Sequence, residues 1–197
     1  FAAPGEGSCG PLLNEVMADP DSDWDGNGSY SYRDDEFVEI FNPGPGPLPL
    51  DGLFLADELG GYVFGFTGTL AEGAVRVVYG SESVAWEQAN GQAATGLRLG
   101  NDGDTVQLVQ VIEGVSTTVD AYTYTTYEAE DDRASGRNPD GGTWELFDAL
   151  NPYAGETPPA GNGLPPSPGG PNGMEDPPPS PVAERSWGQI KALYTVR

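Results

Sequence analysis

Residues 105–124 read Thr-Val-Gln-Leu-Val-Gln-Val-Ile-Glu-Gly-Val-Ser-Thr-Thr-Val-Asp-Ala-Tyr-Thr-Tyr, and this stretch decides the fold class. Its first eight residues place apolar side chains on both faces of an extended chain, which is typical of a central strand between two layers. Glu113-Gly114 then predicts a tight hairpin turn. The residues after the turn alternate and are rich in β-formers, as in a half-buried strand. The stretch therefore predicts a hairpin of strands at 105–112 and 115–124.

Similar strand-like runs recur along the first 150 residues, separated by turns that contain Gly, Pro, Asn and Asp. Further strands are expected at 12–17, 36–42, 62–67, 74–79 and 143–147, and one short helix at 83–90. Seven short strands with such turns favour an all-β fold, an antiparallel β-sandwich.

Four segments are predicted along the chain. Residues 1–11 would form an N-terminal arm and residues 12–150 the sandwich. Residues 151–183 hold 11 prolines and 6 glycines, a composition typical of an extended tether. Residues 184–197 form an amphipathic tail that we expect to dock on another surface.

The charge of the chain is strongly negative, with 31 acidic residues against 8 Lys and Arg and no His. Such a body should repel nucleic acid and anionic membrane surfaces and attract divalent cations and basic partners. No run of about 18 apolar residues is present, so no membrane insertion is expected. The chain begins at Phe1, and we expect a mature, secreted protein of the extracellular space or cell surface. A single cysteine, Cys9, excludes an intrachain disulfide but leaves a bond to another chain open.

Six motifs resemble, in order, the lamin-tail domain as found in exported bacterial proteins. The first two are Leu13-Asn-Glu-Val-Met-Ala-Asp-Pro20 and Asp35-Glu-Phe-Val-Glu-Ile-Phe-Asn-Pro43. The others lie at 48–57, 69–78, 99–109 and 135–144, so the resemblance covers roughly residues 10–155. It implies an immunoglobulin-like β-sandwich. It implies little about activity, because such domains are non-catalytic modules with varied binding roles. The tail lies outside the resemblance.

The loop after the first predicted strand carries Asp21-Ser-Asp-Trp-Asp-Gly-Asn-Gly28, the first half of an EF-hand-type calcium loop. Alternate carboxylates point to one side, and the glycine at the sixth position allows a sharp turn. The twelfth position holds Tyr32 instead of an acid, so a carboxylate from 34–36 would have to complete the shell. The candidate ligands for Ca²⁺ are Asp21, Asp23, Asp25, Asn27, Asp34, Asp35 and Glu36. The alternative is a solvated acidic turn.

Catalysis is not expected from this composition. Without His, the usual Ser-His-Asp and Cys-His arrangements and His-ligated zinc are excluded, and one Cys makes a thiolate site implausible. Paired carboxylates for glycoside hydrolysis remain conceivable, but so acidic a body brings some carboxylates together by chance. We expect a protein that is not an enzyme.

The tail supports two interpretations, since its apolar residues alternate as in a strand and also align on one face of a helix. As a strand on a long tether, it would suit addition to an exposed sheet edge. The expected interface residues are Arg185, Trp187, Ile190, Lys191, Leu193, Tyr194 and Arg197. The alternatives are a tail that folds back on its own domain or serves as a sorting signal.

Two functions follow from these features. The first is a subunit of a self-assembling filament or surface layer, a homo-oligomer in which the tail docks head-to-tail on the next copy. The second is a monomeric, calcium-dependent cell-surface module that binds carbohydrate or protein. Clustered tyrosines, at 30 and 32 and between 122 and 127, suit the carbohydrate partner.

Overall fold

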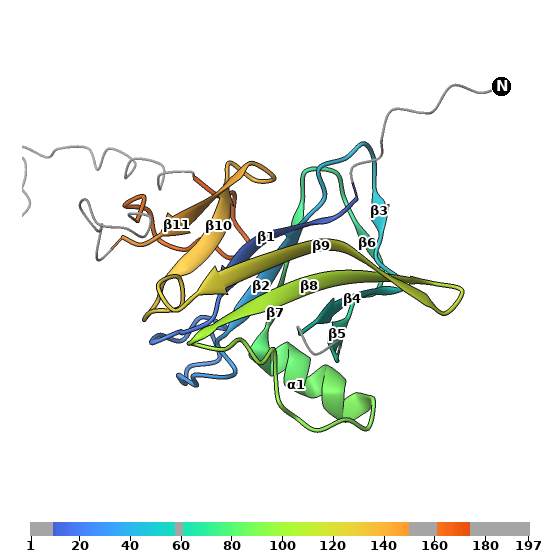
Figure 1. Ribbon diagram of the computed structural model, residues 1–197, viewed down its shortest axis with the longest axis horizontal. Helices are drawn as coiled ribbons and strands as arrows, with labels where there is room; N and C mark the ends of the chain where they lie inside the picture. Colours follow the sequence, from blue (N-terminus) through green and yellow to red (C-terminus); the bar gives the residue numbers. More distant parts are fainter. Residues whose placement is uncertain (1–9, 58–60, 150–160, 174–197) are drawn as a thin grey trace, which may run out of the picture.

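Two antiparallel sheets form the layers of the structure, a computed structural model that describes residues 10–57, 61–149 and 161–173 (Figure 1). One sheet has the strand order β11-β10-β1-β2-β7 and the other the order β5-β4-β8-β9, while β3 and β6 form a separate pair. The elements are β1 (Leu12–Met17), β2 (Phe37–Phe41), β3 (Leu48–Pro49), β4 (Leu53–Ala56), β5 (Tyr62–Gly65), β6 (Thr69–Leu70), β7 (Val75–Tyr79), α1 (Gly80–Ala89), β8 (Gly103–Ile112), β9 (Val115–Thr125), β10 (Ala134–Asn138) and β11 (Thr143–Phe147).

The predicted antiparallel sandwich is confirmed. All seven expected strands are present within two residues of their expected bounds, and the helix begins three residues earlier than predicted. Periodicity missed the short strands β3, β4 and β6, which have four residues or fewer. It also missed β10, because the sequence Ala-Ser-Gly-Arg-Asn has no apolar alternation. Pairing with β1 on one side and β11 on the other holds this strand in the sheet. The N-terminal arm up to Cys9, the last predicted sandwich residue 150, the tether residues 151–160 and 174–183, and the tail lie outside the described residues.

A bulge in β1 decides which side chains face the core. The register between β1 and β2 shifts between Leu13 and Glu15, so Asn14 is the extra residue. Leu13 and Val16 both enter the main core between the sheets, whereas Met17 joins the apolar cluster on the outer face of the five-stranded sheet. Glu15 consequently faces outward too, opposite Glu39 of β2.

The main core lies between the two sheets. It joins side chains of β1, β2 and β7 to side chains of β4, β8 and β9, and many of them are fully buried. A second cluster covers the outer face of the five-stranded sheet and is built from Met17, Phe37, Val77, Ala134 and Phe147. The five-stranded sheet is therefore buried on both faces, and this predicts an outer cover in addition to the second sheet.

The helix α1 meets the acidic loop at Gly80. The Gly80 N–H donates to the carbonyl of Glu36, and the Ser81 N–H donates to that of Asp34. A Cβ at Gly80 would lie 1.9 Å from the carbonyl oxygen of Arg33, which leaves no room for any side chain. This close approach fixes the end of the acidic loop against the helix.

We expect Gly80→Ala to destabilise the domain, because the added methyl forces the helix and the loop apart. Overpacking of this kind costs about 1–3 kcal/mol, and the contact is with backbone that cannot rotate away. Chemical denaturation of the full chain measures the change. Gly10→Ala is the matched control, since nothing lies within 4 Å of the Cβ position there. Equal stability of the two variants would contradict the expectation.

Candidate functional site

The acidic loop between β1 and β2 is organised around one buried carboxylate, Asp35. Its Oδ1 accepts hydrogen bonds from the N–H groups of Trp24, at 2.8 Å, and Asp25, at 3.0 Å. Its Oδ2 accepts from the N–H of Ser31 at 2.7 Å. Asp35 has no exposed surface, and three backbone donors take the place of water around its charge. The loop is thus wound around this side chain from both sides.

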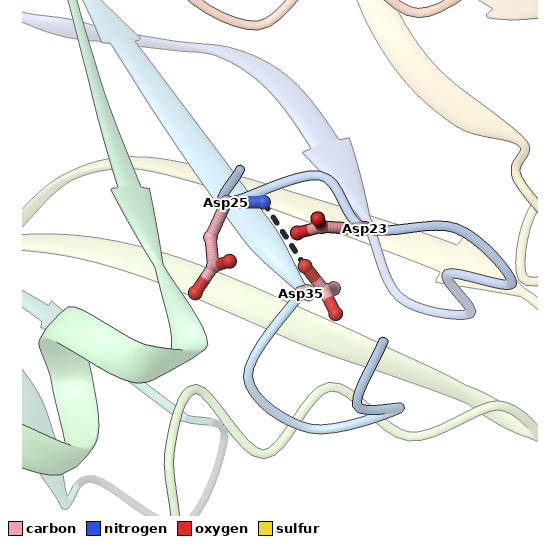
Figure 2. Close-up of side chains that lie close together, drawn as sticks. All are labelled: Asp23, Asp25 and Asp35. Atoms are coloured by element: carbon pink, nitrogen blue, oxygen red, sulfur yellow. Dashed lines mark hydrogen bonds between the residues drawn. The ribbon is translucent and has the colours of Figure 1, made fainter. Parts of the chain in front are cut away.

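Three carboxylates converge in this loop. One carboxylate oxygen each of Asp23, Asp25 and Asp35 lies within 4.8 Å of the other two. Figure 2 shows the three side chains. Asp23 is exposed and accepts from the Gly28 N–H, and Asp25 accepts from the backbone and side chain of Asn27. Partial burial opposes ionisation of Asp25, but hydrogen bonds from Ser81 and Asn27 outweigh it and lower its pKa. The described residues place no Arg against these three acids.

The other predicted ligands lie elsewhere. Asp21 is exposed and stands outside the group, and Asp34 forms an ion pair with Arg33 at 2.7 Å. Glu36 is buried, with its Oε2 3.5 Å from the Leu99 N–H, and burial raises its pKa to about 9. Asn27 stays in the loop, but its side-chain oxygen accepts from the Ser29 N–H. The structure therefore brings together three of the seven candidates as a carboxylate group.

Asp132, which the sequence did not single out, anchors the loop from outside. Its Oδ1 accepts from the Asp21 N–H at 2.8 Å and from the Trp24 indole N–H at 2.7 Å. The Ser22 hydroxyl donates to its other oxygen. About 110 residues separate these partners along the chain, so no local pattern could reveal the contact. The acidic run 128–132 supplies this anchor.

Every Arg that the structure describes is engaged by an acid. Arg33 pairs with Asp34, Arg76 with Glu82, Arg98 with Asp57, Arg133 with Asp148, and Arg137 with Asp120. The first 150 residues contain 27 acids and these 5 Arg, so the arginines leave a large excess of negative charge. That excess favours cations and basic segments as ligands of this surface.

The hairpin of β8 and β9 projects beyond the sandwich (Figure 1). It carries exposed apolar side chains. Ile112 and Val115 are each 65 % exposed, and Val119 is 40 % exposed. In the described part of the chain, β9 has no strand partner on its outer side. Near Asp120 the strand approaches β1, where an Asp120 oxygen accepts from the Leu13 N–H. The free edge therefore covers residues 115–119.

The predicted tyrosine clusters are divided by the fold. Tyr124 is buried in the main core, and Tyr122 stacks on Trp144 with ring centroids 3.7 Å apart. Tyr30 and Tyr32 remain exposed at the acidic loop. The predicted interface residues Arg185, Trp187, Ile190, Lys191, Leu193, Tyr194 and Arg197 lie outside the described residues.

We expect Asp35→Asn to unfold more readily than the natural chain even when a chelator removes all divalent ions. An amide offers one acceptor oxygen where the carboxylate offers two, so a buried N–H loses its partner at a cost of about 1–3 kcal/mol. Asp21→Asn is the matched control, since this side chain is exposed, and its change should stay within about 0.5 kcal/mol. Urea denaturation in chelator measures both. An Asp35→Asn variant as stable as the natural chain would show that the loop does not depend on this carboxylate.

One of the three comparisons with known proteins found a match, and that match agrees with the observed architecture. No curated protein and no solved structure matches the chain. Within the described residues, no helix has the length and hydropathy needed to cross a membrane. The family model of the Lamin Tail Domain matches residues 8–126, which is more than half of the chain and ends before β10 and β11. The chain belongs to the lamin tail domain family.

Proposed function

We propose that this chain is a non-enzymatic, secreted structural protein whose domains join head to tail through residues 184–197. The observation that carries the proposal is the free edge of β9, where exposed valines flank unpaired backbone groups. A strand laid against residues 115–119 would extend the sheet by main-chain hydrogen bonds. Its apolar side chains would cover Val115 and Val119.

The distribution of charge also supports the tail of a second copy as the partner of this edge. The tail of a second copy brings Arg185, Lys191 and Arg197 to a domain whose described arginines are all engaged by acids. Long-range attraction of this kind speeds encounter and orients the tail, while the apolar contacts supply affinity. An edge on one copy and a tail on the next form a heterologous interface, which propagates into a filament unless its rotation closes a ring.

Deletion of residues 184–197 should abolish assembly and leave the sandwich folded. Light scattering of the purified full chain is expected to show species larger than the 20.7 kDa monomer, and the truncated chain only the monomer. Near-ultraviolet circular dichroism checks that the domain persists.

A matched pair of substitutions tests where the tail docks. Val115→Lys places a charge on the β9 edge and should weaken assembly, whereas Tyr127→Lys places the same charge at an exposed apolar position away from that edge. Assembly that survives tail deletion would refute the proposal, and equal behaviour of the two Lys variants would place the docking site elsewhere.

A second candidate is a calcium-dependent surface module that binds carbohydrate or protein, and the convergence of Asp23, Asp25 and Asp35 favours it. Three carboxylates without an Arg partner form an oxygen-rich site that suits a hard cation, since Ca²⁺ takes six to eight oxygen ligands. Oxygens that already accept one N–H retain a second lone pair for a metal. The ion would stabilise the loop and place the exposed Tyr30 and Tyr32 for contact with a ligand.

Calcium should raise the melting temperature of the full chain by several degrees relative to chelator, because binding to the folded state alone adds about 2.7 kcal/mol at a hundredfold excess over Kd. Calorimetric titration should give one site. Asp23→Asn should remove most of the binding heat, and Asp21→Asn, which lies outside the carboxylate group, should retain it. Absence of heat in the natural chain would reject the calcium site without affecting the assembly proposal.

A further inference from the structure

Residues 161–173, part of the predicted tether, lie on the outer face of the five-stranded sheet of their own chain and are here named the strap. The strap begins beside β11, where the Asn162 N–H donates to the Leu146 carbonyl at 2.8 Å. It crosses toward β1 and β2, and Asn172 then returns to β1, donating to the Asn14 carbonyl. Figure 1 shows this segment in orange beside β10 and β11. The strap is the cover that the outer apolar cluster requires.

A turn in the strap presents two N–H groups to a pair of buried carboxyl groups. Ser167-Pro-Gly-Gly170 closes with a hydrogen bond from the Gly170 N–H to the Ser167 carbonyl, and Gly169 has φ +80°, as a type II turn requires. The Ser167 N–H donates to Glu15 Oε1 at 3.0 Å, and the Gly169 N–H donates to Glu39 Oε2 at 2.7 Å. Both glutamates have no exposed surface and are register partners on β1 and β2.

The partners of the four oxygens indicate where a proton sits. Both oxygens of Glu39 accept from N–H donors, namely Gly169 and the Asn14 amide, so Glu39 is the group of the pair that loses its proton first. Glu15 Oε2 faces only the Ser167 hydroxyl at 3.4 Å, and that hydroxyl lies 2.8 Å from Asn172 Oδ1, to which it can donate. A protonated Glu15 Oε2 can then donate to the hydroxyl oxygen, so the pair is best satisfied with one proton, on Glu15.

The charges that face this pair from the surrounding elements are all acidic. Glu15 and Glu39 face each other, Asp140 approaches from the turn between β10 and β11, and the Tyr79 phenol approaches from β7. The strap itself carries no titratable side chain, and no Arg of the described residues pairs with either glutamate. A second negative charge in this cluster would therefore meet repulsion without compensation.

Few apolar contacts hold the strap in place. Leu164 is partly buried against the outer cluster, and Asn172 is the one strap residue that is fully enclosed. A cleft of about 410 Å³ remains between the strap prolines and the side chains of Trp24, Tyr79 and Phe147. Hydrogen bonds, more than packing, thus hold the strap. Besides the bonds to the two glutamates, Asn162 donates to the Leu146 carbonyl and Asn172 donates to Asp140 and to the Asn14 carbonyl. The bonds to the glutamates are the ones that the loss of a proton from the pair can change.

We propose that residues 161–173 are a releasable strap, docked on the outer face of the five-stranded sheet through Glu15 and Glu39, and that loss of the last proton from this pair detaches the strap and exposes the apolar face beneath. The surface is thus a docking site for an extended Pro- and Gly-rich segment, filled by the chain's own strap. Aromatic side chains beside such a segment are the usual means of recognising it. This proposal does not depend on assembly or on calcium.

The direction of the pH response follows from burial. Burial raises the pKa of Glu15 from 4.5 to about 8 and that of Glu39 to about 7. Detachment of the strap would return both carboxyl groups to water and their pKa values toward 4.5, so the docked state holds more protons than the detached state between pH 4.5 and 8. The stabilisation from docking is fully present below pH 4.5 and is lost as the pH rises through about 7 to 8, so the strap should detach on the alkaline side.

Carbon-detected carbonyl–nitrogen NMR of the full chain tests the proposal, because it observes the strap prolines and is unaffected by amide exchange at high pH. We expect docked signals at pH 6 and a fall of about tenfold or more in the ratio of docked to detached strap by pH 9. Signals of the main-core strands should not change.

Two substitutions separate the roles of the pair. Glu15→Gln reproduces the protonated acid, with an acceptor for Ser167 N–H and a donor for its hydroxyl, and should keep the strap docked at pH 9. At pH 6, below its pKa of about 7, Glu39 is itself mostly protonated, so Glu39→Gln should leave the strap docked there. By removing one of the two charges, it should also lessen the loss of docking at pH 9. Asp102→Asn, an exposed change of equal charge, should behave as the natural chain. A strap equally docked at pH 6 and 9, or a Glu15→Gln chain that responds to pH like the natural one, would overturn the proposal.

Discussion

The pairing of β1 with β2 is the constraint on which the remaining structure depends. These strands lie inside the five-stranded sheet, and the bulge at Asn14 sets the direction of each side chain around it. Leu13 and Val16 enter the main core on one side, while Glu15 and Glu39 meet on the other. The same pair of strands holds the two ends of the acidic loop. The main core, the acidic loop and the strap contacts therefore all depend on the register between β1 and β2. A slip of one residue in that register would exchange the side chains that face the main core with those that face the strap.

An acidic chain has to place some carboxylates inside, and this domain stabilises them in different ways. Asp35 accepts three backbone N–H groups and winds the loop around itself. Asp148 lies 2.8 Å from the guanidinium of the buried Arg133. Glu15 and Glu39 have no exposed surface and pair with no Arg of the described residues, and rely on N–H groups that the strap and Asn14 supply. The third arrangement differs from the first two, because two carboxyl groups face each other there and no cation of the described residues balances them.

The strap extends the domain beyond the part that the family model describes. The model matches residues 8–126, and β10, β11 and the strap all follow that range. β10 enters the sheet beside β1, and Gly136 allows the Phe147 ring to lie where a Cβ would stand 2.7 Å from it. Phe147 then joins Met17 and Phe37 in the outer cluster, which the strap covers. The strands and the strap that follow the matched range thus complete the outer face on which the Glu15–Glu39 pair lies.

Periodicity was a sufficient guide for strands whose own side chains pack, such as β8 and β9, because alternation over eight or more residues leaves few other conformations. It failed for β10, whose place depends on neighbours on both sides rather than on its own side chains. In the acidic loop, the spacing of Asp23 and Asp25 pointed to a shared site, and Asp35 was among the acids considered to complete it. Glu36, the adjacent acid, points instead toward Leu99, since successive side chains on an extended chain face opposite ways.

The sequence by itself determined the fold class, the family and the acidic character of the surface, because these depend on local patterns and on composition. Only the tertiary structure decided that Asp132 anchors the loop, that Glu15 and Glu39 form a pair, and that part of a Pro-rich tether lies on its own domain. Those contacts join residues that stand from about 25 to 150 positions apart. Strand order and register bring such residues together, and a local sequence pattern does not indicate which distant residues will meet.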